Sequence, residues 1–165
     1  MLTKTLIRTF VLSSVSLLYM PTSVAQKVDT SRAVQWSARV RPSKSATSVN
    51  VAVTAAIQPG WHLYALDQEQ GGPVPTMIRL ASGQPFTLAG PVKQPDPIMA
   101  TDPNFDMPVR YFEQSATFSV PLTRQAASKS ASDVTLEVSY QTCNDRFCLP
   151  VTTAKVQAHI PAAAR

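Results

Sequence analysis

Fourteen prolines are spread along this chain, and in the segments between them apolar residues recur at every second position. Proline interrupts helices because it lacks a backbone N–H and clashes with the preceding turn. Apolar residues at alternate positions instead line one face of a β-strand. This pattern, many short strands without a sustained helical stripe, predicts an all-β fold, an antiparallel β-sandwich, with a small closed barrel as the alternative. The predicted strands are 34–40, 49–57, 61–64, 77–80, 86–88, 118–122, 134–140 and 151–160.

The longest stretch without strand character runs from Pro91 to Pro108. Loops of this length are often functional. Three carboxylates, Asp96, Asp102 and Asp106, fall within it. Their spacing is wider than a calcium-binding loop requires. We therefore expect them to be solvated.

The N-terminus has the pattern of an export signal over residues 1–25, with basic residues, a mostly apolar stretch and small residues before a cut after Ala25. The apolar stretch is shorter than the roughly 20 residues that a membrane span needs. We therefore expect a cleaved signal peptide, followed by a single domain over residues 26–165 in an exported protein.

The charge of the chain indicates no particular partner. The net charge is +5, but the basic residues are scattered and aromatic residues do not interleave them. A groove for single-stranded nucleic acid needs both features. We expect no nucleic-acid partner, and the sequence makes no prediction of the oligomeric state.

The chain contains two cysteines, Cys143 and Cys148, between its last two predicted strands. In an oxidising compartment such a close pair normally forms a disulfide. If the flanking strands pair as a hairpin, the cysteines face each other near its tip, with Cα atoms about 5.5 Å apart. Loop entropy assigns so small a ring only about 2 kcal/mol of stabilisation. A structural bridge is one interpretation of the pair, within an exported binding or scaffold module.

A redox centre is the second interpretation. Thiol–disulfide exchange favours a small ring near a loop tip, with a sulfur that an incoming thiolate can reach. Arg146, between the cysteines, favours a thiolate, whereas Asp145 opposes one.

A metal carrier is the third interpretation. Zinc would need ligands besides the two sulfurs, but His62 and His159 are far apart in the sequence and show no ligand spacing. Each histidine is expected to be a surface or strand residue. Copper(I) would use thioether ligands, for which the candidates are Met77, Met99 and Met107. We predict no metal and no other cofactor.

The residues around the cysteines also resemble a known family. Tyr140-Gln141, the cysteine pair and the following Leu149-Pro150 resemble the active-site segment of the N-terminal periplasmic domain of the thiol:disulfide interchange protein DsbD. Residues 59–64 are similar to that family's Gly-aromatic-x-Leu-Tyr strand, and residues 102–111 to the loop before its next strand. The cysteine spacing here is one residue shorter than in the best-known members.

The resemblance implies an immunoglobulin-like β-sandwich in the periplasm, whose cysteine pair shuttles between dithiol and disulfide like that of a protein-disulfide reductase. By analogy, Cys148 forms the mixed disulfide with a partner and Cys143 resolves it. A cap loop over residues 102–107 would shield the pair, with Asp102 at its start and Phe105 as the covering aromatic. The resemblance also places Tyr64 and Tyr140 along the site, for which ordinary core packing is the alternative.

The resemblance further implies partners. Family members take electrons from a thioredoxin-like domain, fed by a membrane-embedded donor, and pass them to periplasmic oxidoreductases. Here we expect a stand-alone form, whose thioredoxin-like partner and membrane-embedded donor are separate proteins.

Overall fold

The computed structural model describes residues 33–41, 47–125 and 130–162. The predicted signal peptide, residues 1–25, lies outside these ranges. The regular elements within them are strands: β1 (Val34–Arg41), β2 (Ser48–Ile57), β3 (His62–Tyr64), β4 (Met77–Leu80), β5 (Phe86–Leu88), β6 (Ile98–Asp102), β7 (Met107–Phe112), β8 (Ser115–Arg124), β9 (Ser132–Tyr140), β10 (Thr142–Cys143) and β11 (Thr152–Ile160). No helix in these ranges is long and apolar enough to cross a membrane.

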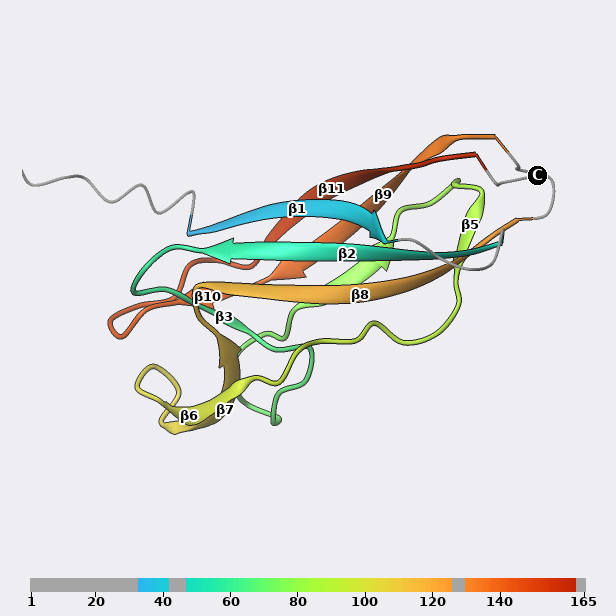
Figure 1. Ribbon diagram of the computed structural model, residues 1–165. Coiled ribbons are helices and arrows are strands. Elements are labelled where there is room, and N and C mark those ends of the chain that lie inside the picture. The colour runs from blue at the N-terminus through green and yellow to red at the C-terminus, as the bar shows by residue number, and fades with distance from the viewer. Residues whose placement is uncertain (1–32, 42–46, 126–129, 163–165) are drawn as a thin grey trace, which may run out of the picture.

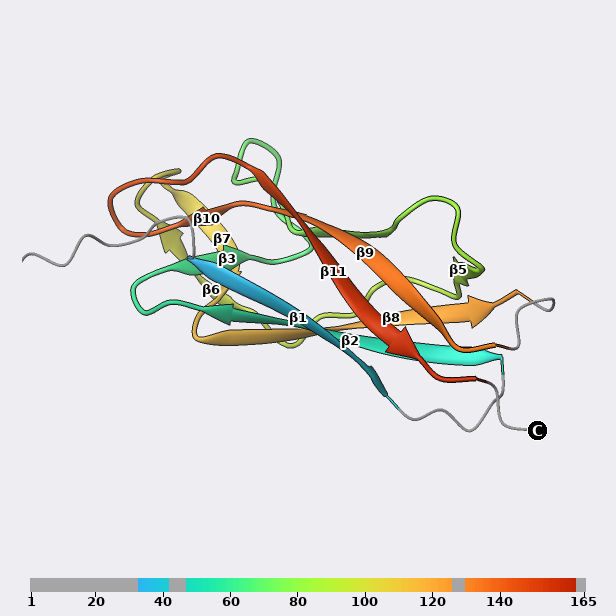
Figure 2. The ribbon, with the colours of Figure 1, turned by 90° about the horizontal axis from the view of Figure 1, so that it is seen from above.

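The strands form three antiparallel sheets, in the orders β1-β2-β8-β5, β11-β9-β4 and β10-β3-β7-β6. The first two sheets make the body of the molecule, in which β9 and β11 cross the long strands β1, β2 and β8 (Figures 1 and 2). The third sheet lies at one end of this body, beside the loop that connects β10 to β11. The predicted antiparallel sandwich is confirmed, and the described strands form separate sheets and not the alternative closed barrel.

The main core lies between the two large sheets and follows from the alternation in the sequence. In β2 and β8, Val51 is paired with Val120 and Val53 with Phe118, and all four side chains are buried. Burying one such side chain stabilises a fold by about 1.5–3 kcal/mol. From the second sheet, the main core takes the alternate residues of β9, which are Val134, Leu136 and Val138.

The segment from Pro91 to Pro108, expected to be a loop, contains β6 and the start of β7. This expectation was wrong because β6 carries no apolar alternation: four of its five residues are exposed or half-buried, and only Asp102 is buried. As the edge strand of the third sheet, β6 is held by its pairing with β7. β7 was missed because its buried residues, Val109 and Phe112, are three positions apart instead of two. β10 was missed because two residues are too short for a periodic signal.

A tight turn directs β3 into the third sheet. Gly60 has a positive φ of 78°, and the N–H of Trp61 donates to the carbonyl of Gln58 at 3.1 Å. Proline followed by a glycine with positive φ is typical of a type II turn. The turn separates β2, in the body of the sandwich, from β3, which carries His62 and Tyr64.

Candidate functional site

The two cysteines form a disulfide at the tip of a hairpin. β9 and β11 pair antiparallel, with Tyr140 opposite Thr152, and Cys143 and Cys148 face each other beyond them. Their Cα atoms are 4.0 Å apart, closer than the 5.5 Å expected from the sequence. The predicted hairpin and the predicted pairing are both present.

The two cysteine residues differ in their exposure. Cys143 lies in β10, is paired with β3, and is 0% exposed. Cys148 follows the turn of the hairpin loop and is only partly buried. Of the two cysteines, Cys148 is therefore the one with surface open to solvent.

The disulfide lies in a small apolar cluster that is separate from the main core. We call this group the site cluster; its members are Tyr64, Val109, Cys143, Phe105, Met107, Tyr111 and Cys148. The Phe105 ring meets the Tyr64 ring edge-on, with centroids 6.0 Å apart. Two of the aromatic residues named by the resemblance are thus brought together beside the cysteines.

The turn between β6 and β7, residues 103–106, forms one wall of the site cluster, and we call it the cap turn. Asp102 organises it: its Oδ1 accepts from the N–H of Asn104 at 2.8 Å, and its carbonyl accepts from the N–H of Asp106 at 2.8 Å. The Asn104 amide then donates to the carbonyl of Asn144, in the cysteine loop, at 2.8 Å. A hydrogen bond therefore ties the cap turn to the loop that holds the disulfide.

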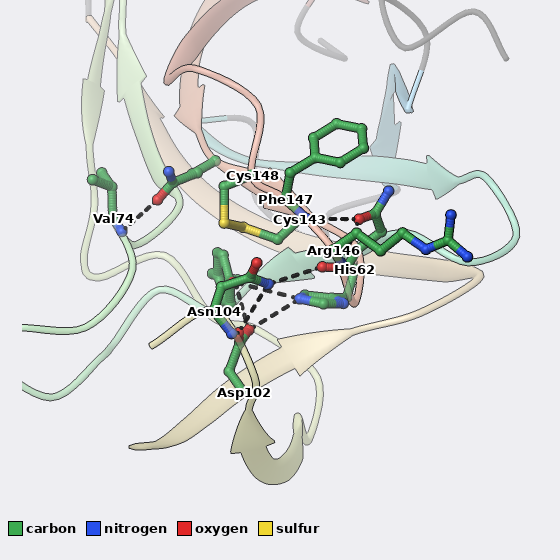
Figure 3. Close-up of a disulfide and its surroundings, with 11 residues drawn as sticks. His62, Val74, Asp102, Asn104, Cys143, Arg146, Phe147 and Cys148 are labelled. Atoms are coloured by element: carbon green, nitrogen blue, oxygen red, sulfur yellow. Dashed lines mark hydrogen bonds and ion pairs between the residues drawn. A yellow bond between two sulfur atoms is a disulfide. The ribbon is translucent and has the colours of Figure 1, made fainter. Parts of the chain in front are cut away.

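Three polar side chains form a buried network under the disulfide (Figure 3). Oδ2 of Asp102 accepts from the hydroxyl of Tyr64 at 2.6 Å and lies 3.1 Å from Nε2 of His62. Asp102 is 3% exposed and His62 is 7% exposed. The expectation of a solvated carboxylate was wrong for Asp102, because β6 directs it inward to partners from β3.

The network fixes the charge of two of its members. Burial raises the pKa of Asp102, but hydrogen bonds from Tyr64 and Asn104 and the nearby His62 outweigh burial and hold it below its ordinary value. Burial first, and then the hydrogen bond and charge of Asp102, raise the pKa of Tyr64 well above its ordinary value. At neutral pH, Asp102 is therefore a carboxylate and Tyr64 a protonated phenol.

The resemblance also placed Tyr140 along the site, but the structure does not bring it into the site cluster. Tyr140 packs against the main core, and its ring centroid is 5.3 Å from that of Trp36. The reason is the alternation of side chains along β9, since Tyr140 lies on the same face of the strand as the buried Leu136 and Val138. For this residue, the core-packing alternative describes its position.

Residues between the cysteines shape the loop itself. Oδ1 of Asn144 accepts from the N–H groups of Arg146 and Phe147 at 2.9 and 3.0 Å. The Phe147 ring, 45% exposed, packs edge-on against Trp61 with centroids 5.5 Å apart. The Arg146 side chain extends away from the disulfide (Figure 3).

The sequence interpretation missed His62, Asn104 and Asn144 as parts of the site. His62 lies in a strand, as expected, but its burial was not foreseen. One signal was available: His62 and Tyr64 alternate on a three-residue strand within the family-like segment, so that they share a face.

The residues considered as metal ligands are dispersed. His159 is exposed on β11, with Nδ1 2.7 Å from Asp133. Met77 and Met99 are exposed, whereas Met107 packs in the site cluster. Among the residues that the structure describes, no three or more His, Cys, Asp or Glu side chains are grouped to hold a metal ion.

Comparisons with known proteins give a family model and several similar solved structures. The family model described as "Thiol:disulfide interchange protein DsbD, N-terminal" matches residues 29–159. The N-terminal periplasmic domain of ScsB from Proteus mirabilis has 16% sequence identity and a TM-score of 0.50, over 75% of this chain and 44% of that chain. The reduced N-terminal domain of Neisseria meningitidis DsbD has 16% sequence identity and a TM-score of 0.44, over 73% of this chain and 81% of that chain. No curated protein sequence matches.

These comparisons bear on the fold. At this identity, the likeness to the ScsB domain shows the fold alone, and this chain spans less than half the length of that one. Together with the antiparallel sheets, it identifies the immunoglobulin-like β-sandwich that the resemblance implied.

Proposed function

Since this chain belongs to the family of DsbD N-terminal domains, we propose that it carries out thiol–disulfide exchange through Cys143 and Cys148. The observation that carries the proposal is the unequal burial of the two cysteine residues, since Cys143 is 0% exposed and Cys148 is partly exposed. Exchange needs one sulfur open to attack and one that can leave and return. A bridge that only stabilises the fold has no need of this difference.

The proposed reaction begins at Cys148. A partner thiolate attacks Sγ of Cys148, a new disulfide joins partner and protein, and the bond between Cys148 and Cys143 breaks with its electron pair on Sγ of Cys143. The second thiol of the partner, as a thiolate, then attacks the partner sulfur of the mixed disulfide. The partner leaves oxidised, Cys148 leaves as a thiolate, and the protein holds a dithiol. The same steps in reverse reduce a downstream disulfide, with Cys143 resolving the mixed disulfide.

The cap turn controls access in this proposal. Phe105 lies against Tyr64 at the wall of the site cluster, and Asp102 and Asn104 hold the turn against the cysteine loop. A partner must displace or pass this turn to reach Cys148. Phe105, Asp102 and Tyr64 are therefore proposed as shielding and lining residues rather than as groups that exchange electrons.

The proposed partner is a thioredoxin-like protein or domain, with a membrane-embedded donor as the source of electrons. The solved relatives are described as periplasmic N-terminal domains or as a DsbD domain. We accordingly propose a periplasmic location, with residues 1–25 as a cleaved signal and residues 26–165 as one domain. Protein-disulfide reductase is the proposed activity class.

The reduction potential of the pair tests the proposed function. Structural disulfides typically have potentials below about −300 mV, whereas exchanging pairs lie higher. We expect equilibration with glutathione or a thioredoxin to give a value above this limit. In parallel, replacing both cysteines by serine should abolish exchange. Two results together would identify a structural bridge: a reduction potential below about −300 mV, and a double cysteine-to-serine variant that is less stable but keeps its activity in cells.

A further inference from the structure

The opening of the disulfide leaves a charge in an unfavourable place. In the proposed function, the electron pair of the broken bond goes to Sγ of Cys143, which is 0% exposed. A buried thiolate is costly in apolar surroundings. The carboxylate of Asp102, buried in the adjoining network, adds repulsion between like charges. The reaction therefore gains from a group that gives Cys143 a proton.

His62 is placed to be that group. It is directly opposite Cys143 in the pairing of β3 and β10. Side chains opposite each other in an antiparallel pair lie on the same face, with Cβ atoms about 5 Å apart. Figure 3 shows His62, Asn104 and Asp102 together on one side of the disulfide. Histidine is also the side chain that ordinarily exchanges a proton between about pH 5 and 8.

Other titratable groups near His62 are poorly suited to the task. Tyr64 keeps its proton because its pKa is raised, and Asp102 has none to give because its pKa is lowered. Burial first, and then the charges of Glu113, Asp145 and Asp102, raise the pKa of Tyr111, so this phenol also stays protonated. The groups that face His62 are Tyr64 from β3, Asp102 from β6, Tyr111 from β7 and Cys143 from β10.

We propose that His62 gives a proton to Sγ of Cys143 as the disulfide opens, and takes it back when Cys143 attacks to close the disulfide again. In the opening step, the imidazolium becomes a neutral imidazole and the Cys143 thiolate becomes a thiol. Closing reverses both changes. Asp102 is a positioning residue for this step, because its Oδ2 holds the ring through Nε2 at 3.1 Å. This inference rests on the proposed function.

The test measures the rate at which dithiothreitol reduces the oxidised protein between about pH 5 and 8. Each rate is divided by the fraction of dithiothreitol present as thiolate, so that the remaining pH dependence belongs to the protein. Cys143 does not titrate in the oxidised protein because it is in the disulfide. We expect the corrected rate constant of the wild type to fall as pH rises across this range, because the proposed proton donor must be protonated.

The variant His62→Gln separates proton transfer from structure, because its amide can still donate to Asp102. We expect it to have a flat profile, and to be slower than the wild type at the acid end by about 100-fold, a typical effect of a general acid. The matched control is His159→Gln, since His159 is exposed on β11. The control should keep the wild-type profile. A wild-type profile in His62→Gln would overturn the inference while leaving the proposed function intact.

A second measurement needs no variant and so does not depend on whether His62→Gln folds. The chain has two histidines, and NMR can follow the titration of both imidazoles in the oxidised and the reduced protein. We expect the titration midpoint of His62 to differ between the two redox states and that of His159 to be the same. Equal midpoints for His62 would overturn the inference. A wild type that dithiothreitol does not reduce at all would overturn the proposed function as well.

Discussion

The main core and the site cluster are two apolar interiors of one small protein, but they bury different chemistry. Apart from the buried Trp61 and the Trp36 and Tyr140 rings at its margin, the main core is made of aliphatic and phenylalanine side chains, most of them from long alternating strands. The site cluster places a disulfide against Tyr64, beside the buried His62 and Asp102, and comes from short strands and a turn. The difference teaches that burial in the main core supplies stability, whereas burial in the site cluster, under the proposed function, limits access to one cysteine.

The largest effect on stability should come from truncating the main core. Phe118 is fully buried, and its ring lies 6.0 Å from Trp36 and 5.6 Å from Phe112. Phe118→Ala should lower the free energy of unfolding by about 3–5 kcal/mol. Urea denaturation measures this loss. Under conditions where the variant is folded, its rate of thiol–disulfide exchange should match that of the wild type. A parallel fall in that rate would show that the main core and the site cluster are not independent.

A smaller effect, and one that depends on pH, should come from the polar network. The pKa of Asp102 is lowered from 3.8 in the folded protein, so its carboxylate stabilises the fold above the unfolded-state pKa. That contribution is lost as pH falls through the folded-state pKa. Asp102→Asn should therefore lower the free energy of unfolding by about 1.5 kcal/mol at neutral pH, through weakened charged hydrogen bonds.

The pH dependence distinguishes this effect from simple loss of packing. The difference between Asp102→Asn and the wild type should shrink as pH falls below about 4. The matched control is Asp133→Asn, which removes an exposed carboxylate paired with His159. An exposed pair contributes about 0–1 kcal/mol. A deficit for Asp102→Asn that stays constant down to acid pH would contradict the network as described.

The smallest effect on stability should come from the cap turn. Phe105 is partly buried at the edge of the site cluster. Phe105→Ala should lower the free energy of unfolding by less than about 2 kcal/mol, below the range for buried Phe-to-Ala changes. It should also make the reduced Cys148 react several-fold faster with iodoacetamide. Met99→Ala, on the same hairpin and 66% exposed, is the matched control. Equal alkylation rates in the two variants would show that Phe105 does not shield Cys148.

The contrast between the main core and the site cluster also explains which strands and site residues could be predicted from the sequence. Alternation identified the strands of the main core, such as β2 and β8, because each has one face in water and one in the interior. It missed β6, β7 and β10, where pairing with neighbouring strands and not periodicity holds the strand. The cysteine pair followed from its spacing in the sequence, whereas Phe105 and Tyr64 followed only from the family resemblance. The contact of His62 with Asp102 did not, since these residues are 40 positions apart and meet only through the third sheet.

The central claim is that unequal burial assigns different roles to the two sulfurs, and trapping with single-cysteine variants tests it most directly. Cys143→Ser retains the accessible Cys148, whereas Cys148→Ser retains the buried Cys143. Each variant is mixed with a thioredoxin whose single remaining active-site cysteine is activated as a mixed disulfide with thionitrobenzoate. We expect Cys143→Ser to form the covalent complex at least ten times faster, about 1.4 kcal/mol in activation free energy. Equal rates, or faster capture by Cys148→Ser, would contradict the account.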